Sequence, residues 1–140
     1  MKNYIVEEKY QEIIKLIPIF CIDFLIRNED RILLIKRKEE PLKDIYWFPG
    51  GRLRLNETIE ELTIRILKNE VGKVFNDYKL IGFSNYIFNN FENSRAIHTP
   101  TLIFEIEVDK IFKPILDEKH SDYIWSLKLP REFKISNKFI

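Results

Sequence analysis

GRLRLNETIEELTIRILKNEVG, residues 51–72, is the stretch of sequence that decides the fold. Apolar residues recur in it at helical spacing, which predicts a helix from about Glu57 to Val71. Asn56 is suited to cap the start of this helix, and Gly72 is suited to end it. We expect one side of the helix to be buried, because it carries a wide apolar arc of Ile59, Leu62, Ile64, Ile66, Leu67 and Val71.

The charged side chains of the same helix form a second pattern. Glu57, Glu61 and Arg65 stand at positions i, i+4 and i+8 on the opposite side, where salt bridges form easily. Glu70 instead points into the apolar arc, where a lone carboxylate is costly unless a cation or hydrogen-bond donors meet it. Two interpretations stay open: Glu70 has such a partner or a raised pKa, or the helix rotates near its end and leaves Glu70 in solvent.

Extended segments are expected on both sides of this helix. The nearly continuous apolar run from Ile19 to Ile26 is typical of a strand buried on both faces, and Arg31–Lys36 predicts a neighbouring strand. Further strands are expected at about 78–91, 101–108 and 123–127, with a polar turn at 89–94 and a short helix at 7–16. Strands before and after a central helix predict an α/β or α+β sandwich with a mixed sheet.

The composition fits one small domain. The chain has 140 residues, of which 45% are hydrophobic and 32% charged, so we expect a single packed domain over residues 1–140. A net charge of +1 argues against nucleic-acid binding, which usually shows as a basic excess. Cys21 is the one cysteine and fits a reducing compartment, and no apolar run approaches the roughly 20 residues of a membrane span. We expect a cytoplasmic protein with no membrane partner.

The spacing within residues 51–72 resembles a known family pattern, the Nudix box. That pattern is G-x5-E-x7-R-E-U-x-E-E-x-G-U, where U is a bulky aliphatic residue. The matching residues are Gly51, Glu57, Arg65, Glu70, Val71 and Gly72. Two carboxylates of the box are missing, because Ile66 and Asn69 take their places. Most Nudix enzymes use that carboxylate cluster to hold several divalent ions and cut a phosphoanhydride.

One branch of this family, the GDP-mannose mannosyl hydrolases, lacks the same two carboxylates. Segments between Pro18 and Trp125 resemble this branch and occur in the same order along the chain, namely Pro18–Phe24, Leu33–Arg37, Tyr46–Arg52 and Asp117–Trp125. The resemblance implies a Nudix fold, with a mixed β-sheet sandwiched between α-helices, and a homodimer. It also implies hydrolysis of a GDP-hexose, foremost GDP-mannose, to GDP and free sugar by attack of water at the anomeric carbon.

The resemblance assigns roles to individual residues. His120 matches the general base for water, a task that suits a histidine because its ordinary pKa lies near neutrality. Asp23, Arg37 and Arg52 match substrate-binding residues, and the two arginines face the diphosphate. Arginine suits that position because it stays charged and can hold two phosphate oxygens at once.

The implied cofactor is Mg²⁺, with the carbonyl of Gly50 and the carboxylate of Glu70 matching two of its ligands. Lys119 stands where the branch carries a glutamine ligand, and an ammonium group has no lone pair and repels Mg²⁺. Lys119 then points outward, takes the place of the metal, or marks a site without catalysis. Thr99 replaces a substrate-contacting tyrosine, which leaves sugar recognition open, and His98 before it is expected to be structural.

Two other functions stay open on the sequence alone. The first is an ordinary Nudix pyrophosphohydrolase of a nucleoside diphosphate derivative, although Ile66 and Asn69 leave its metal cluster short of charge. The second is a non-catalytic module that binds a nucleotide sugar, which Lys119 and Thr99 favour. Products separate the two enzymes, because the branch releases sugar and GDP, whereas a pyrophosphohydrolase releases sugar phosphate and GMP.

Overall fold

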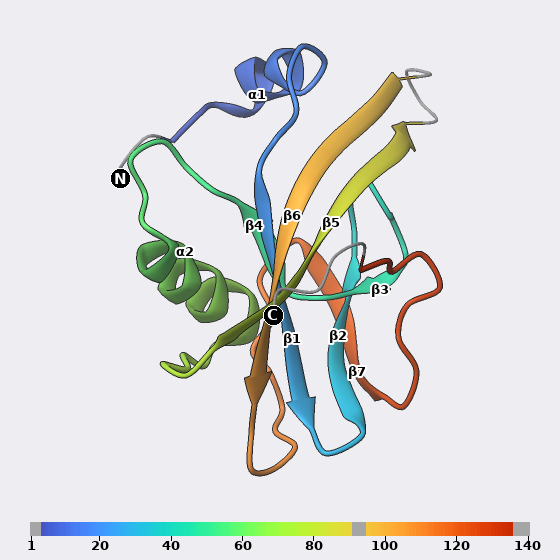
Figure 1. The fold of residues 1–140 in the computed structure, drawn as a ribbon. Coiled ribbons are helices and arrows are strands. Elements are labelled where there is room, and N and C mark those ends of the chain that lie inside the picture. The colour runs from blue at the N-terminus through green and yellow to red at the C-terminus, as the bar shows by residue number, and fades with distance from the viewer. Residues whose placement is uncertain (1–3, 91–94, 136–140) are drawn as a thin grey trace.

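The computed structural model describes residues 4–90 and 95–135, which build a seven-stranded mixed sheet (Figure 1). Its strands are β1 (Cys21–Asn28), β2 (Arg31–Arg37), β3 (Tyr46–Trp47), β4 (Gly50–Arg52), β5 (Lys79–Asn90), β6 (Arg95–Glu107) and β7 (His120–Ser126). They follow the order β3–β2–β1–β6–β5, with β4 also paired to β1 and β7 to β2. The pair β1–β6 is parallel and β1–β2 is antiparallel, so the predicted mixed sheet is confirmed.

The central strand β1 is buried on both faces, as its sequence predicts. On one face, Ile22, Phe24 and Ile26 pack against the central helix segment, and on the other face Leu25 joins an aromatic cluster. That cluster includes Trp47, Phe48, Tyr86 and, from the end of the described chain, Phe133. Apolar residues therefore cover both faces of β1, which explains its nearly continuous hydrophobic run, and Asp23 is the buried polar exception.

The central helix α2 (Ile59–Ile66) begins two residues later than predicted, and Asn56 is not its N-cap. Thr58 takes that role, because its side chain accepts the N–H of Glu61 while the Glu61 carboxylate accepts the N–H of Thr58. Asn56 lies in the preceding turn with a φ of 62°, in the left-handed region that asparagine tolerates. The Thr-x-x-Glu pattern of a capping box was the better signal for the start of the helix.

The last turn of this helical segment widens into a π-helix, η1 (Leu67–Val71), which shifts the side chains that follow. The N–H of Gly72 donates to the carbonyl of Leu67 over 2.9 Å, and Gly72 ends the segment with a φ of 77°, as predicted. The buried side is narrower than predicted, because Ile59 and Ile64 are 37% and 44% exposed. Leu62, Ile66, Leu67 and Val71 supply the contacts with the sheet.

Other boundaries also differ from the predictions, since the short helix α1 (Glu7–Ile13) ends at Ile13 rather than at residue 16 and β1 begins at Cys21 rather than at Ile19. Strand β6 begins at Arg95 rather than at residue 101, and β7 begins at His120 rather than at residue 123. Strand β5 continues through Asn90, so the predicted polar turn at 89–94 is wrong at its start, and residues 91–94 lie outside the described residues. Helix α1 is anchored by a small cluster of Ile14, Ile19 and Ile97. Among the described residues, no helix is both long enough and apolar enough to cross a membrane.

Candidate active site

The pairing register of the sheet brings predicted site residues together in pairs. Asp23 of β1 lies opposite Gly50 of β4, and Arg37 of β2 lies opposite His120 of β7. His120 lies before the strand expected at 123–127, but in the structure it is the first residue of β7 and is 7% exposed. The sheet therefore fixes the backbone of all four residues.

His120 lies between two carboxyl groups. Its Nδ1 atom is 2.6 Å from Oδ1 of Asp117, and its Nε2 atom is 4.0 Å from Oε1 of Glu70. When the Nδ1 proton is donated to Asp117, Nε2 is left with a lone pair that can accept a proton from water. This arrangement suits a general base held in one orientation by a carboxylate.

Asp117 is a site residue that the sequence reasoning missed. Burial alone would raise the pKa of this carboxyl group. The hydrogen bond and charge of His120, together with the hydrogen bond from the Lys119 N–H, have a larger opposite effect, so the pKa is lowered. Asp117 is therefore ionised near neutral pH, as a partner for the imidazole must be. Its position three residues before His120, in the turn that leads into β7, was the available signal.

Glu70 turns inward, so the interpretation that placed it in solvent is wrong. Its side chain is 12% exposed, and its Oε1 atom accepts the N–H of Gly50 over 3.2 Å. Burial, followed by the negative charge of Asp117, raises the pKa of Glu70 to about 8. The carboxyl group sits at the end of η1, where the π-turn carries it towards the start of β4.

Asp23 lies beneath Gly50 rather than on an open surface. Its Oδ2 atom accepts the indole N–H of Trp47 over 3.1 Å, and the residue is 8% exposed. Burial raises the pKa of Asp23 to about 7, against the opposing effects of the Trp47 hydrogen bond and the charge of Arg37. A Cβ atom on Gly50 would collide with Asp23, so glycine is required for this close approach.

A bidentate ion pair between Arg65 and Glu57 holds the loop between β4 and α2. Arg65 Nε lies 2.7 Å from Oε2 of Glu57, and Arg65 Nη2 lies 2.8 Å from Oε1 of the same carboxylate. The same Nη2 donates to the carbonyl of Arg52 over 2.9 Å. The predicted pairing of Glu57 with Arg65 is present, and it fixes the backbone that carries Gly50 and Arg52.

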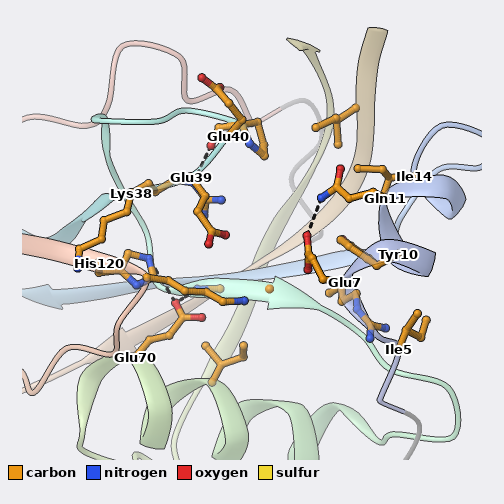
Figure 2. A pocket seen from close by; sticks show the side chains of 18 of the residues that line it. Ile5, Glu7, Tyr10, Gln11, Ile14, Lys38, Glu39, Glu40, Glu70 and His120 are labelled. Carbon is orange, nitrogen blue, oxygen red and sulfur yellow. Dashed lines mark hydrogen bonds and ion pairs between the residues drawn. The ribbon is translucent and has the colours of Figure 1, made fainter. Parts of the chain in front are cut away.

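A cavity of about 550 Å³ opens beside these groups. Five of the six predicted site residues line it, namely Arg37, Gly50, Arg52, Glu70 and His120, whereas Asp23 lies below the floor. Figure 2 shows His120 and Glu70 together at one end and Glu7, Tyr10 and Gln11 of α1 across from them. The sequence reasoning missed this contribution of α1, because an amphipathic helix carries no signal for which side of the sheet it covers.

The lining of the cavity is suited to an anionic ligand. Of the described residues that line it, seven are Arg or Lys and four are Glu. Arg52 also stacks on the ring of Tyr10, with its guanidinium carbon 5.1 Å from the ring centre. A volume of this size can take a drug-sized or nucleotide-sized ligand.

The donor set does not fit a preformed metal cluster. Within residues 4–90 and 95–135, no three His, Cys, Asp or Glu side chains are placed to hold an ion together. Ile66 is buried in the core, and Asn69 points to solvent, so neither replaces a missing carboxylate. Of the expected ligands, Glu70 already accepts a backbone N–H of Gly50.

Comparison with known proteins agrees with the box and the sheet. The sequence profile of the NUDIX domain matches residues 19–133. This chain belongs to the Nudix family. It is 31% identical over 91 residues to an ADP-ribose pyrophosphatase of Methanocaldococcus jannaschii, a match that covers 65% of the chain and 52% of that relative. It is 25% identical over 105 residues to the low-salt glycan biosynthesis protein Agl8 of Haloferax volcanii, covering 74% of the chain and 67% of that protein.

Solved structures confirm the Nudix fold. A MutT NUDIX hydrolase from Burkholderia pseudomallei aligns with a TM-score of 0.69 at 24% identity, over 84% of the chain and 91% of that structure. The NUDIX domain of Shewanella oneidensis NrtR, solved with ADP-ribose, aligns with a TM-score of 0.63 at 16% identity, covering 86% and 82% of the two chains. The chain spans about half the length of the M. jannaschii relative.

Proposed function

We propose that this Nudix protein hydrolyses a GDP-hexose, with GDP-mannose the first candidate, to GDP and free sugar. The observation that carries the proposal is the His120–Asp117 pair, whose Nε2 atom faces a cation-lined cavity beside Glu70. Membership of the Nudix family supports a hydrolase that acts on a nucleotide derivative. The matched segments of the mannosyl hydrolase branch support the particular substrate.

In the proposed step, a water molecule attacks the anomeric carbon of the sugar. His120 Nε2 takes the proton of that water, while the bond between the anomeric carbon and the diphosphate oxygen breaks and its electron pair leaves with GDP. Asp117 holds the imidazole in the required tautomer and stabilises the imidazolium that forms. The configuration at the anomeric carbon inverts, since water enters opposite to the leaving group.

Arg37 and Arg52 bind the diphosphate in this scheme. Both line the cavity, and Arg37 lies opposite His120 in the sheet, which places its charge next to the base. Guanidinium groups match phosphate oxygens in pairs and stabilise the charge that develops on the departing diphosphate. Asp23 lies below Gly50, so we propose that it contacts the sugar only when the substrate or a movement of β4 exposes its carboxyl group.

A second candidate is a pyrophosphohydrolase that cuts between the two phosphates. The similarity to an ADP-ribose pyrophosphatase favours it. Ile66 and Asn69 oppose it, because attack on phosphorus in this family depends on the carboxylate cluster that these residues replace. A non-catalytic module for nucleotide sugars is the third candidate.

Hydrolysis in ¹⁸O-labelled water separates the three candidates. GDP-mannose and, in parallel, ADP-ribose are incubated with the protein, with Mg²⁺ or with EDTA, and the products are weighed by mass spectrometry. Label in free mannose with unlabelled GDP is the expected result. Label in a nucleoside monophosphate or sugar phosphate would establish the pyrophosphohydrolase. Binding of GDP-mannose with no turnover in any condition would establish the non-catalytic module.

A further inference from the structure

We propose that the ε-ammonium group of Lys119 binds the diphosphate in this cavity in place of a divalent metal ion, so that a nucleoside diphosphate binds without metal. The inference rests on the proposed function only for the class of ligand, a nucleoside diphosphate. It concerns the binding step and does not depend on which bond is cut.

The backbone of Lys119 is fixed at the end of the cavity where His120 lies. Its N–H donates to Oδ1 of Asp117 over 3.1 Å, and its carbonyl accepts the N–H of Lys38 over 3.0 Å. The next residue, His120, pairs with Arg37 across β7 and β2. Two backbone hydrogen bonds and the sheet thus hold the base of the lysine side chain next to the general base and a guanidinium group.

The side chain of Lys119 is free to move to a ligand. The residue is exposed, it lines the cavity, and its ammonium group has no ion-pair partner within residues 4–90 and 95–135. Its positive charge contributes to the field at Asp117, which places it in the same electrostatic environment as His120. An ammonium group offers three donors and a compact charge, which suit phosphate oxygens.

The same end of the cavity is a poor place for a divalent cation. Glu70 is the one carboxylate that the box supplies here, and its Oε1 atom already accepts the Gly50 N–H. Ile66, which stands where the box carries a carboxylate, lines the cavity with an apolar side chain and offers no oxygen ligand. An ion beside Glu70 would also meet the charge of Arg37, and the nearby Asp117 carboxylate is already hydrogen-bonded to His120 and to the Lys119 N–H, whereas Mg²⁺ is bound through carboxylate or phosphate oxygens.

The Arg and Lys side chains that line the cavity can neutralise the negative charge of the diphosphate. Arg37 ends β2 and Lys38 follows it, Lys119 lies in the turn before β7, and Arg52 comes from β4. These side chains approach one cavity from two segments of the sheet. A diphosphate can therefore be neutralised by protein groups alone.

Isothermal titration calorimetry with GDP tests the proposal. The wild-type protein is titrated in EDTA and in Mg²⁺, and we expect affinities that agree within about twofold. Lys119→Gln should weaken GDP binding in EDTA by roughly 10- to 100-fold, the loss expected for one hydrogen bond to a charged group. Lys113→Gln is the matched control, because Lys113 is an exposed lysine that does not line the cavity.

A second readout follows the metal directly. Electron paramagnetic resonance of Mn²⁺ added to the free protein should show no tight site in the wild type and a tighter one in Lys119→Gln. Wild-type GDP binding that requires Mg²⁺, or a Lys119→Gln protein with unchanged GDP affinity, would overturn the proposal. Absence of GDP-mannose turnover together with metal-free GDP binding would refute the proposed function and leave this inference standing.

Discussion

The indole Nε1 atom of Trp47 donates a hydrogen bond to Oδ2 of Asp23 across 3.1 Å in the interior of the protein. This is a neutral donor, and no Lys or Arg forms an ion pair with Asp23 in the part of the chain that the structure describes. Burial raises the pKa of Asp23 to about 7, from an ordinary value of 3.8. Asp23 is thus kept in the fold at a cost in stability, as is common for groups that serve a site.

The first prediction is that Asp23→Asn stabilises the protein at alkaline pH. The unfolded chain releases the Asp23 proton near pH 4, but the folded chain holds it up to about pH 7, so stability falls as pH rises between these values. Asparagine has no proton to lose and still offers an oxygen to Trp47. We expect a gain of roughly 2–4 kcal/mol at pH 8 and little gain at pH 4 by urea denaturation. A loss of stability at pH 8 would show that the ionised carboxylate is well accommodated.

The second prediction concerns His120 as the proposed base. His120→Ala should lower kcat by about 10²–10⁴ and leave substrate binding nearly intact, because a general base acts on the reacting water. The measurement is turnover of the substrate identified by the ¹⁸O experiment, combined with calorimetric binding of the same substrate. Unchanged kcat would remove His120 from the mechanism.

The third prediction separates the positioning of His120 from its chemistry. Asp117→Asn keeps a side chain of the same size at 2.6 Å from Nδ1 but removes the charge that fixes the tautomer. We expect kcat to fall by up to about 10²-fold, less than for loss of the base itself, with KM little changed. A purely structural role of Asp117 would lower the amount of folded protein and leave the kcat of the folded protein unchanged.

The sequence predicted the local elements of this fold better than their pairing. The apolar runs of β1 and β2 and the spacing between Glu57 and Arg65 were visible, and the structure contains both strands and that ion pair. The pairings of Asp23 with Gly50 and of Arg37 with His120 were not predicted, because neither β4 nor the first residues of β7 lay in an expected strand. The six site residues were assigned by resemblance rather than by any such pattern.

Other features could not be predicted because they depend on tertiary contacts. A helical wheel with 100° per residue placed Glu70 on the apolar side, but it could not show the π-turn at residues 67–71, which precedes the contact of Glu70 with Gly50. The contact of α1 with the cavity depends on how residues 14–20 cross the sheet, for which the sequence has no periodic signal. Asp117 is an ordinary turn residue until the fold places it against His120.

The fourth prediction uses the acid sensitivity of the Glu57–Arg65 pair. The hydrogen bond from Arg65 lowers the pKa of Glu57 more than burial raises it. A lowered carboxyl pKa contributes stability above the unfolded value, and this contribution is lost as pH falls through the folded value. Glu57→Gln should therefore cost about 1.5–3 kcal/mol at pH 7, typical of hydrogen bonds to charged groups, and much less below pH 4.

Chemical denaturation of wild type and Glu57→Gln from pH 7 to pH 3 measures this difference. Glu60→Gln is a matched control, because Glu60 is an exposed carboxylate on the same helix. A difference in the free energy of unfolding between wild type and Glu57→Gln that is the same at every pH would show that the charge of Glu57 is unimportant.

The last prediction compares two adjacent glycines. A Cβ atom on Gly50 would lie 2.5 Å from the carbonyl oxygen of Ile22 and 3.0 Å from the Cα of Asp23, both backbone atoms of β1. A Cβ on Gly51 would instead meet Cδ1 of Ile66 at 2.9 Å, the flexible end of a side chain. Gly50→Ala must therefore separate β4 from β1, whereas Gly51→Ala needs only a small rotation of Ile66.

Gly50→Ala should lower the free energy of unfolding by about 3 kcal/mol, at the upper end of overpacking effects, and Gly51→Ala by about 1 kcal/mol. Because Trp47 lies three residues before Gly50 and contacts Asp23, its fluorescence should change in Gly50→Ala and remain near the wild-type spectrum in Gly51→Ala. Where Gly50→Ala still folds, GDP affinity should fall, since the strand that carries Arg52 is displaced. Equal destabilisation by the two substitutions would contradict the close packing of β4 on Asp23.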